Sequence, residues 1–562
     1  MGWGVSCCGQ GESIWQTSGK RAGQAPFDQT QGRLRLGSGQ ACLGLVLLAA
    51  LSFCRLSLCY GNALDETWSR FDRYLATFDP AGYYVRQPVE QTIPALTFKG
   101  FLRQWSDINL HRNQKVGFRN KDFRFMQLQS FMELELHYQV SPNLEITNVD
   151  HFLYDGVYNW KDSGGLFAPR RSETARVYHN FERIVRELYI SYRTHSFDAV
   201  LGKQQIAWGK MDGRFIDMIN PMDIREVIQL DAGDFEWRRL PTWMANMTYF
   251  FGANSLQFLY IPNFEQERGP VPGSPWFPPS VPPSSAIVKD RKRPSAGDFG
   301  DHEYGVRLDV SMEPLTWGLI YFYAWNDNPN FFITGVDTSD GVVRPILTPR
   351  HTRLHHIGVT ADYATAFSGV PVVGELPMVL RVEGLLSTNV KFADRLRQRA
   401  ALTGGKEGGV VSRDTLRAAV ALELALPGNT TFIFQPSFFY TFGWQNSLAS
   451  GGFGGATAGR EEREGVFVPV ANELSFFPVV FIGRPFRFTR DRLRISVTTL
   501  PVFSWPKSDF EGMSNELTFS YSFSQFITGS VRYSTYDGGG RNELFGQYNK
   551  WDNIGWEISY EF

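Results

Sequence analysis

The sequence alternates apolar and polar residues over long segments, and this period of two is clearest in its last strand. There the apolar residues Ile554, Trp556, Ile558, Tyr560 and Phe562 alternate with Asn553, Gly555, Glu557, Ser559 and Glu561. Successive side chains of a β-strand point to opposite faces of the sheet, so such a segment predicts a strand with one apolar and one polar face. Residues 430–444 and 515–523 follow the same pattern. An edge strand of a soluble β-protein would alternate in the same way.

An apolar stretch near the N-terminus predicts export of the chain. It runs from Leu43 to Leu58, is preceded by Arg33 and Arg35, and is followed by a small-residue segment that ends at Ala63. We interpret residues 1–63 as a leader and signal peptide that is cleaved near Ala63. A single transmembrane anchor is the alternative interpretation.

Composition excludes several classes of function for the exported part. All five cysteines lie before residue 60, so neither a disulfide framework nor a thiolate metal site is available after the leader. The formal net charge of -1 gives no indication of nucleic-acid binding. Aromatic residues make up 15% of the chain, a surplus that aromatic girdles at two membrane interfaces would use.

The spacing of turns predicts a barrel with a defined direction. Short turn signals, such as Pro427-Gly428-Asn429 and Ser524-Gln525, alternate along the chain with longer links. Short periplasmic turns opposite long external loops are the layout of outer-membrane barrels. We therefore predict an all-β fold, a large antiparallel transmembrane β-barrel over residues 95–562 with about eighteen strands, in the bacterial outer membrane and in contact with its lipid. Sixteen strands are the alternative, because the segment 473–486 contains two prolines.

Two segments are expected to lie outside the barrel strands. Trp68, Phe71, Tyr74, Leu75 and Phe78 recur at helical spacing, which predicts a short helix within residues 64–94. That helix could dock on the periplasmic rim or plug the lumen. The proline-rich link 263–300 excludes a regular strand or helix, and we expect an external loop there that is a surface insertion rather than a gate.

A motif in the first half of the barrel resembles a known family. Gly202, Lys203 and Gln204 are followed by Trp208 and Gly209, and then by Asn220 and Pro221. With the downstream Leu240-Pro241-Thr242-Trp243, this motif is similar to a Gram-negative family of large outer-membrane barrels that is still described as a domain of unknown function. Genes of that family often neighbour exporters of the resistance, nodulation and division type. The resemblance therefore implies transport and a periplasmic or inner-membrane export system as a partner.

The same motif also has a plainer interpretation, in which Trp208 is an interface aromatic and Asn220-Pro221 forms a turn.

A second resemblance concerns the C-terminal strand. In Gram-negative outer-membrane proteins the terminal aromatic residue and the preceding alternate apolar residues are the recognition signal for the barrel assembly machinery. This resemblance assigns that role here to Trp556, Ile558, Tyr560 and Phe562.

Strand parity places charged side chains on the polar, inward face. These candidate pore-lining residues are Glu303, Arg307, Asp309, Arg381, Glu383, Glu516, Arg532 and Glu557. Rings of such charges could order permeating ions, whereas mutually neutralised pairs would only make the wall rigid. Because both signs occur in similar number, we expect weak ion selectivity.

The inventory of motifs argues against an enzyme. The sequence has no nucleophile elbow, phosphate loop or zinc-protease helix, and the adjacent His355 and His356 point to opposite faces of a strand, so they cannot bind one metal together. No cofactor or metal is expected. We predict a porin-like channel or transporter for a small solute, which is hydrophobic in one version of the hypothesis. The alternative is a structural or adhesive barrel with a closed lumen and partner-binding external loops.

Overall fold

The computed structural model describes most of the chain after residue 77. The described residues are 78–111, 125–158, 184–211, 217–223, 235–268, 287–289, 293–339, 341, 344–370, 374–403, 408–449, 472–506, 509–538, 545–549 and 551–562. All of them belong to the second of two units of the chain, Asp65–Phe562. The leader, and the helix predicted from aromatic spacing before Phe78, lie outside the described residues.

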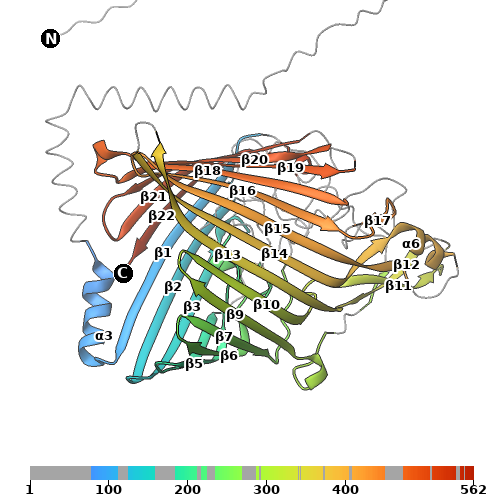
Figure 1. Ribbon diagram of the computed structural model, residues 1–562, viewed down its shortest axis with the longest axis horizontal. Coiled ribbons are helices and arrows are strands. Elements are labelled where there is room, and N and C mark those ends of the chain that lie inside the picture. The colour runs from blue at the N-terminus through green and yellow to red at the C-terminus, as the bar shows by residue number, and fades with distance from the viewer. Residues whose placement is uncertain are drawn as a thin grey trace, which may run out of the picture. The chain divides into compact units, whose positions relative to one another are not determined.

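Within these ranges, eighteen strands form one closed antiparallel sheet (Figure 1). Each pairs with the next along the chain, and β22 pairs with β1 to close the barrel. In order they are β1 (Leu96–Asn109), β2 (Phe125–Ser141), β3 (Leu144–Asp155), β4 (Val185–Arg193), β5 (Phe197–Gln204), β6 (Thr242–Phe251), β7 (Asn254–Ile261), β9 (Glu303–Met312), β10 (Leu315–Trp325), β13 (Arg353–Val370), β14 (Gly374–Asp394), β15 (Val410–Leu426), β16 (Thr430–Thr441), β18 (Leu474–Pro485), β19 (Leu493–Trp505), β20 (Asp509–Ser522), β21 (Ile527–Asp537) and β22 (Asn553–Glu561).

The predicted barrel with about eighteen strands is thus confirmed, and the alternative with sixteen is wrong. The doubtful segment forms β18 in spite of its prolines. Pro478 of β18 lies opposite Pro436 of β16 in the strand register. The two missing N–H groups therefore fall at one position of the ladder instead of interrupting it twice.

Strand parity separates a lipid-facing surface from the interior. On β22, Ile554, Trp556 and Ile558 are 38–50% exposed, whereas Asn553 is fully buried. Apolar side chains on other strands form the same exposed belt, among them Leu188, Leu201, Leu256, Leu319, Val359, Val382, Val420, Ile482, Val497 and Val531. A closed sheet pairs its backbone polar groups internally, and an apolar belt matches hydrocarbon, so the protein spans the bacterial outer membrane.

The ends of the barrel differ in the length of their connections. At one end of the barrel β1 begins and β22 ends. The short turns at residues 142–143, 194–196, 252–253, 313–314, 427–429 and 523–526 lie at this same end. The long links lie at the opposite end, as the turn spacing predicted, together with one short link at residues 506–508. By the layout of such barrels, the end with the short turns is periplasmic.

The external links carry a small second sheet. In it β11 (Asn330–Asp337) pairs with β12 (Arg344–Arg350), which pairs in parallel with β8 (Ile287–Val288). The prediction that the link 263–300 excludes a regular strand is therefore wrong at these two residues, which lie in a part of the link without proline. Helix α6 (Arg395–Leu402) packs against this sheet through Ala401, and β17 (Leu448–Ala449) pairs with the end of β14. Short helical turns complete the described links at this end: α5 (Phe235–Arg238), η2 (Gly156–Tyr158), η6 (Phe299–Asp301) and η8 (Gly546–Tyr548). A further one, η7 (Arg487–Thr489), lies in the periplasmic turn between β18 and β19. Helices long and apolar enough to cross a bilayer are absent from the described ranges.

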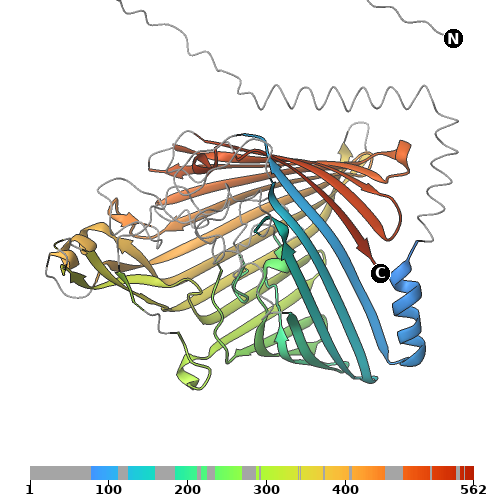
Figure 2. The same ribbon diagram turned by 180° about the vertical axis from the view of Figure 1, so that it is seen from behind.

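The helical segment before β1 lies outside the barrel wall. It comprises η1 (Gly82–Arg86) and α3 (Gln87–Thr92), and both views show α3 beside β1 and the C-terminus (Figures 1 and 2). Tyr560, which has the outward parity of Ile558, donates its hydroxyl hydrogen to Asp79 Oδ1 (2.7 Å) and accepts from Ala81 N–H (3.0 Å). This part of segment 64–94 therefore docks on the outside of the seam between β1 and β22.

Replacing Tyr560 with phenylalanine is expected to loosen this docking. The Tyr560→Phe variant would keep the ring contact but lose both hydrogen bonds, at a cost of about 1–3 kcal/mol to the docked state. Limited proteolysis of the protein in detergent should then cut before β1 faster than in the native protein. Tyr521→Phe is the matched control, because the Tyr521 hydroxyl has no hydrogen bond to a described residue; equal cleavage in both variants would contradict the docking role.

Candidate functional site

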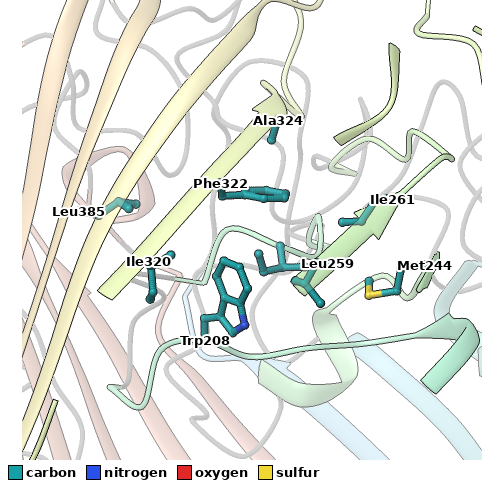
Figure 3. Packing of buried hydrophobic residues seen from close by; sticks show 9 residues of the cluster. Trp208, Met244, Leu259, Ile261, Ile320, Phe322, Ala324 and Leu385 are labelled. Carbon is teal, nitrogen blue, oxygen red and sulfur yellow. The ribbon is translucent and has the colours of Figure 1, made fainter. Parts of the chain in front are cut away.

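The described parts of the link between β5 and β6, residues 205–211, 217–223 and 235–241, lie inside the barrel, and Trp208 is their main apolar anchor. The Trp208 ring is 2% exposed and packs among Leu259 of β7 and Ile320 and Phe322 of β10 (Figure 3). Its Nε1–H donates to Gln257 Oε1 on β7 at 2.7 Å. The interpretation of Trp208 as an interface aromatic is therefore wrong: an indole facing lipid would be exposed, and this one fills an apolar depression on the inner wall.

Glycines in neighbouring strands make this arrangement possible. A Cβ on Gly305 of β9 would lie 2.7 Å from the Trp208 ring, so the wall needs a residue without a side chain there. Gly202, at the end of β5, has a φ of +139°, and a Cβ on it would lie 2.3 Å from the Leu188 carbonyl oxygen. Close backbone approach thus explains the first glycine of the sequence motif.

Asn220 ties the two ends of the link together. Its Oδ1 accepts from Ile206 N–H (2.7 Å), and its Nδ2 donates to the Leu240 carbonyl oxygen (3.0 Å). The Pro221 carbonyl oxygen also accepts from Leu240 N–H at 2.7 Å. Because Asn220 is 1% exposed, these bonds have no competition from water. Asn220 and Pro221 thus hold the two ends of the link together, which is more than the simple turn of the plainer interpretation.

The stretch after Trp208 continues along the inner wall to β13, β14 and β15. Glu383 Oε1 on β14 accepts from Lys210 N–H (2.5 Å) and Met211 N–H (3.1 Å). The Lys210 ammonium pairs with Asp362 of β13, and Met211 packs on Ala419 of β15. Hydrogen bonds to a carboxylate are stronger than those between neutral groups, so Glu383 holds the link against β14.

Strands β9 and β14 supply further charges beside this contact. Arg307 of β9 donates to the Trp208 carbonyl oxygen and pairs with Asp309 through two bonds of 2.7 and 2.8 Å. Arg381 of β14 pairs with Glu423 of β15 at 2.7 Å. Cations and carboxylates thus alternate along this wall. Within each pair the two opposite charges partly cancel, which weakens the electric field that the pair produces in the interior.

The returning half of the link contacts the opposite side of the interior. The Trp237 ring of α5 stacks on Phe101 of β1 (4.9 Å between centroids) and Phe131 of β2 (5.2 Å). Arg186 of β4 donates to the carbonyl oxygens of Trp237 (2.9 Å) and Glu236 (2.5 Å). Described residues of the link therefore contact the inner wall at β13–β15 and also at β1, β2 and β4.

A second charged cluster lies inside the barrel next to the seam. Arg532 of β21 donates to both Asp107 oxygens on β1 (3.0 and 3.2 Å), and Glu516 of β20 lies 3.8 Å away. Arg103 pairs with Glu557 of β22 at 3.2 Å. The Trp105 ring lies between the two guanidinium groups, 4.2 Å from Arg103 Cζ and 4.4 Å from Arg532 Cζ. These contacts join the first and last strands.

The structure thus brings the charged residues predicted from parity into two groups on the inner side. Arg307, Asp309, Arg381 and Glu383 lie beside the link, and Glu516, Arg532 and Glu557 lie at the seam. Glu303 stands apart, where it accepts from Trp325 N–H at 2.7 Å. His356 is buried against Ser387, whereas its neighbour His355 contacts Tyr321 on the outside.

Other parts of the motifs have more limited roles. Lys203 donates to the Val185 carbonyl oxygen (2.6 Å), and Gln204 donates to that of Val200 (3.0 Å); nothing in the structure explains Gly209. In the link before β22, burial raises the pKa of Asp552, while the hydrogen bond that its carboxylate accepts from Tyr536 N–H (3.1 Å) opposes the shift. The carboxyl group of Asp552 therefore stays protonated to a higher pH than an ordinary aspartate.

Several residues of the site were not among the predicted ones. They are Asp107, Asp362, Glu423, Arg186 and Trp237. Asp107 and Asp362 lie in alternating segments, so parity could have placed them inside. Arg186 lies at a register irregularity between β3 and β4, where parity fails, and Trp237 lies in a link, where no period applies.

Comparison with solved structures finds outer-membrane proteins. The protein opdK from Pseudomonas aeruginosa has a TM-score of 0.43 and 9% identity, with 83% of this chain and 98% of that chain covered. A BenF-like porin from Pseudomonas fluorescens Pf-5 has 0.45 and 10%, covering 83% and 98%. OccAB3 from Acinetobacter baumannii has 0.44 and 9%, covering 84% and 100%.

No curated protein matches the chain. A family model does match, over residues 118–562, and this range contains β2 to β22, the link 205–241 and both charged clusters apart from the β1 residues of the seam. The resemblance drawn from Gly202 to Pro221 is confirmed by this match: the chain belongs to the family described as protein of unknown function DUF1302.

Proposed function

We propose that this protein is an outer-membrane channel for small polar solutes, and that the link 205–241 forms its constriction. The observation that carries the proposal is a link held against opposite inner walls of a closed barrel, through Glu383 on one side and Trp237 on the other. Barrels of about this strand number have an interior wide enough for water, and an inward link then sets the size of what passes.

The chemistry beside the link favours a polar solute over a hydrophobic one. The apolar side chains around Trp208 are buried by the link itself, so they are not offered to a solute. Partly exposed charges are offered instead: the side chains of Lys210, Asp309, Arg381 and Glu423 are 49%, 30%, 29% and 33% exposed. Both signs are present, which suits uncharged polar or zwitterionic solutes and gives weak selection between small cations and anions.

Planar-bilayer recordings of the purified mature protein test this proposal. We expect stepwise conductance and, under a potassium chloride gradient, a reversal potential close to zero, because the two signs of charge nearly balance. Strong cation or anion selectivity would contradict the charge argument. An absence of both conductance and liposome uptake of small polar solutes would overturn the channel and favour the closed structural or adhesive barrel.

A further inference from the structure

The periplasmic turn between β18 and β19 carries a dense group of arginines. In the segment 484–494, arginine occurs at positions 484, 487, 490, 492 and 494, and Asp491 supplies the acidic charge. Arg484, Arg487 and Arg490 are exposed, and none of them forms an ion pair with a carboxylate of the described residues. The adjacent periplasmic turns, Pro427-Gly428-Asn429 and Phe523–Phe526, contain no charged residue. The positive charge of this turn is therefore not neutralised by its neighbours.

The turn has a fixed backbone. Phe486 N–H donates to the Leu493 carbonyl oxygen (2.8 Å), and the Phe486 carbonyl oxygen accepts from Thr489 N–H (3.0 Å) and Asp491 N–H (3.2 Å). Thr489 Oγ1 also accepts from Leu493 N–H at 2.9 Å. These bonds cross the turn at several points, so the arginines are presented from an ordered platform.

The position of the turn relative to the lipid-facing belt indicates what it meets. Ile482 of β18 is 44% exposed and belongs to the belt. Arg484 follows two residues later on the same outward face, about 7 Å further along the strand. Phe488, at the tip, is 59% exposed. An outward arginine just past the last lipid-facing apolar residue lies at the level of the periplasmic headgroups.

We infer that this turn binds the headgroup of an anionic phospholipid in the periplasmic leaflet. Arginine donates two parallel N–H bonds to the oxygens of a phosphate group. Unpaired basic side chains near a membrane surface are attracted to anionic lipid, and an exposed aromatic ring beside them favours the interface between headgroup and acyl chain. Charge complementarity and continuity with the apolar belt select this occupant over an acidic periplasmic protein.

Native mass spectrometry of the delipidated full-length mature barrel, titrated with phosphatidylglycerol, tests the inference. The native protein should retain phosphatidylglycerol more tightly than the zwitterionic phosphatidylethanolamine. In the triple variant R484Q/R487Q/R490Q the dissociation constant for phosphatidylglycerol should rise by about fivefold for each arginine replaced. The single variant Arg487→Gln, at an exposed position, should show about one such step and covers the case in which the triple variant does not fold.

The matched control removes the same charge at the external end of the barrel. R395Q/R397Q/R399Q on α6 should bind phosphatidylglycerol like the native protein. Equal binding by the native protein and both turn variants would overturn the inference and leave the turn to an acidic protein. Complete displacement of the lipid by inorganic phosphate would also overturn it, because the site would then recognise a free anion. Lipid retention is measured without conductance, so its failure leaves the proposed channel untouched.

Discussion

Replacing Trp208 with alanine is expected to loosen the link inside the barrel and to raise its conductance. The buried indole packs on Leu259, Ile320 and Phe322 and donates to Gln257. Truncating a buried tryptophan costs about 3–5 kcal/mol, so the released state of this stretch becomes roughly 100-fold or more populated. Single-channel recordings should then show a larger mean conductance with frequent transitions between levels, because the remaining contacts of this stretch, such as those with Glu383, hold it only intermittently.

The control for this experiment is Trp243→Ala. Trp243 lies on β6, directly after the same link, but faces outward and is 48% exposed. Its removal changes the lipid-facing surface and leaves the link in place, so its conductance should equal that of the native protein. Heat-modifiable migration in gels shows that each variant is folded. If Trp208→Ala and Trp243→Ala conduct alike, the link does not limit passage. A native barrel that is silent, with a conductive Trp208→Ala variant, would identify a closed structural barrel.

The strands of the barrel and their two faces could be predicted from the sequence because the alternation that reveals them is a local property. Side-chain direction in a strand repeats every two residues, so Ile558 and Glu557 reveal their opposite faces without any knowledge of neighbouring strands. The same rule placed Arg532 and Glu383 on the inner side. The partners of these residues could not be predicted in this way. Arg532 meets Asp107 across the closing seam, 425 positions away in the chain, and parity carries no information about register between distant strands.

The link was harder to predict than the wall that it crosses. Gly202, Trp208 and Asn220 were noticed as a motif, but their types are equally common at a membrane interface or in a turn. Whether Trp208 faces lipid or the interior depends on two other residues. Gly305 leaves room for the indole ring, and Gln257 accepts its N–H. Those residues lie on strands that follow the link. A single sequence therefore indicates that the motif is special but not which wall receives it.

Removing the carboxylate of Asp107 is expected to have the largest effect on stability. Asp107 is fully buried and accepts from Arg532 and from Trp105 Nε1–H (3.0 Å). In Asp107→Ala the Arg532 guanidinium loses both hydrogen bonds to the carboxylate and stays buried beside Glu516, 3.8 Å away. Breaking a buried ion pair from one side costs about 3–5 kcal/mol. Unfolding of the barrel by urea in detergent can be followed by tryptophan fluorescence. The urea concentration at the midpoint should be lower for Asp107→Ala than for the native protein.

Two further variants separate loss of the charge balance from loss of packing. The double variant Asp107→Ala/Arg532→Leu removes both members of the pair, and replacing a buried pair by apolar groups is close to neutral. It should therefore be more stable than Asp107→Ala, although Glu516 loses the cation that lies 3.8 Å from it. Glu557→Ala removes a carboxylate that pairs with Arg103 at the same seam. The Glu557 side chain is 25% exposed, so water can take its place beside Arg103, and the loss of stability should be smaller than in Asp107→Ala. A double variant as unstable as Asp107→Ala would show that the seam depends on the shape of Asp107 rather than on its charge.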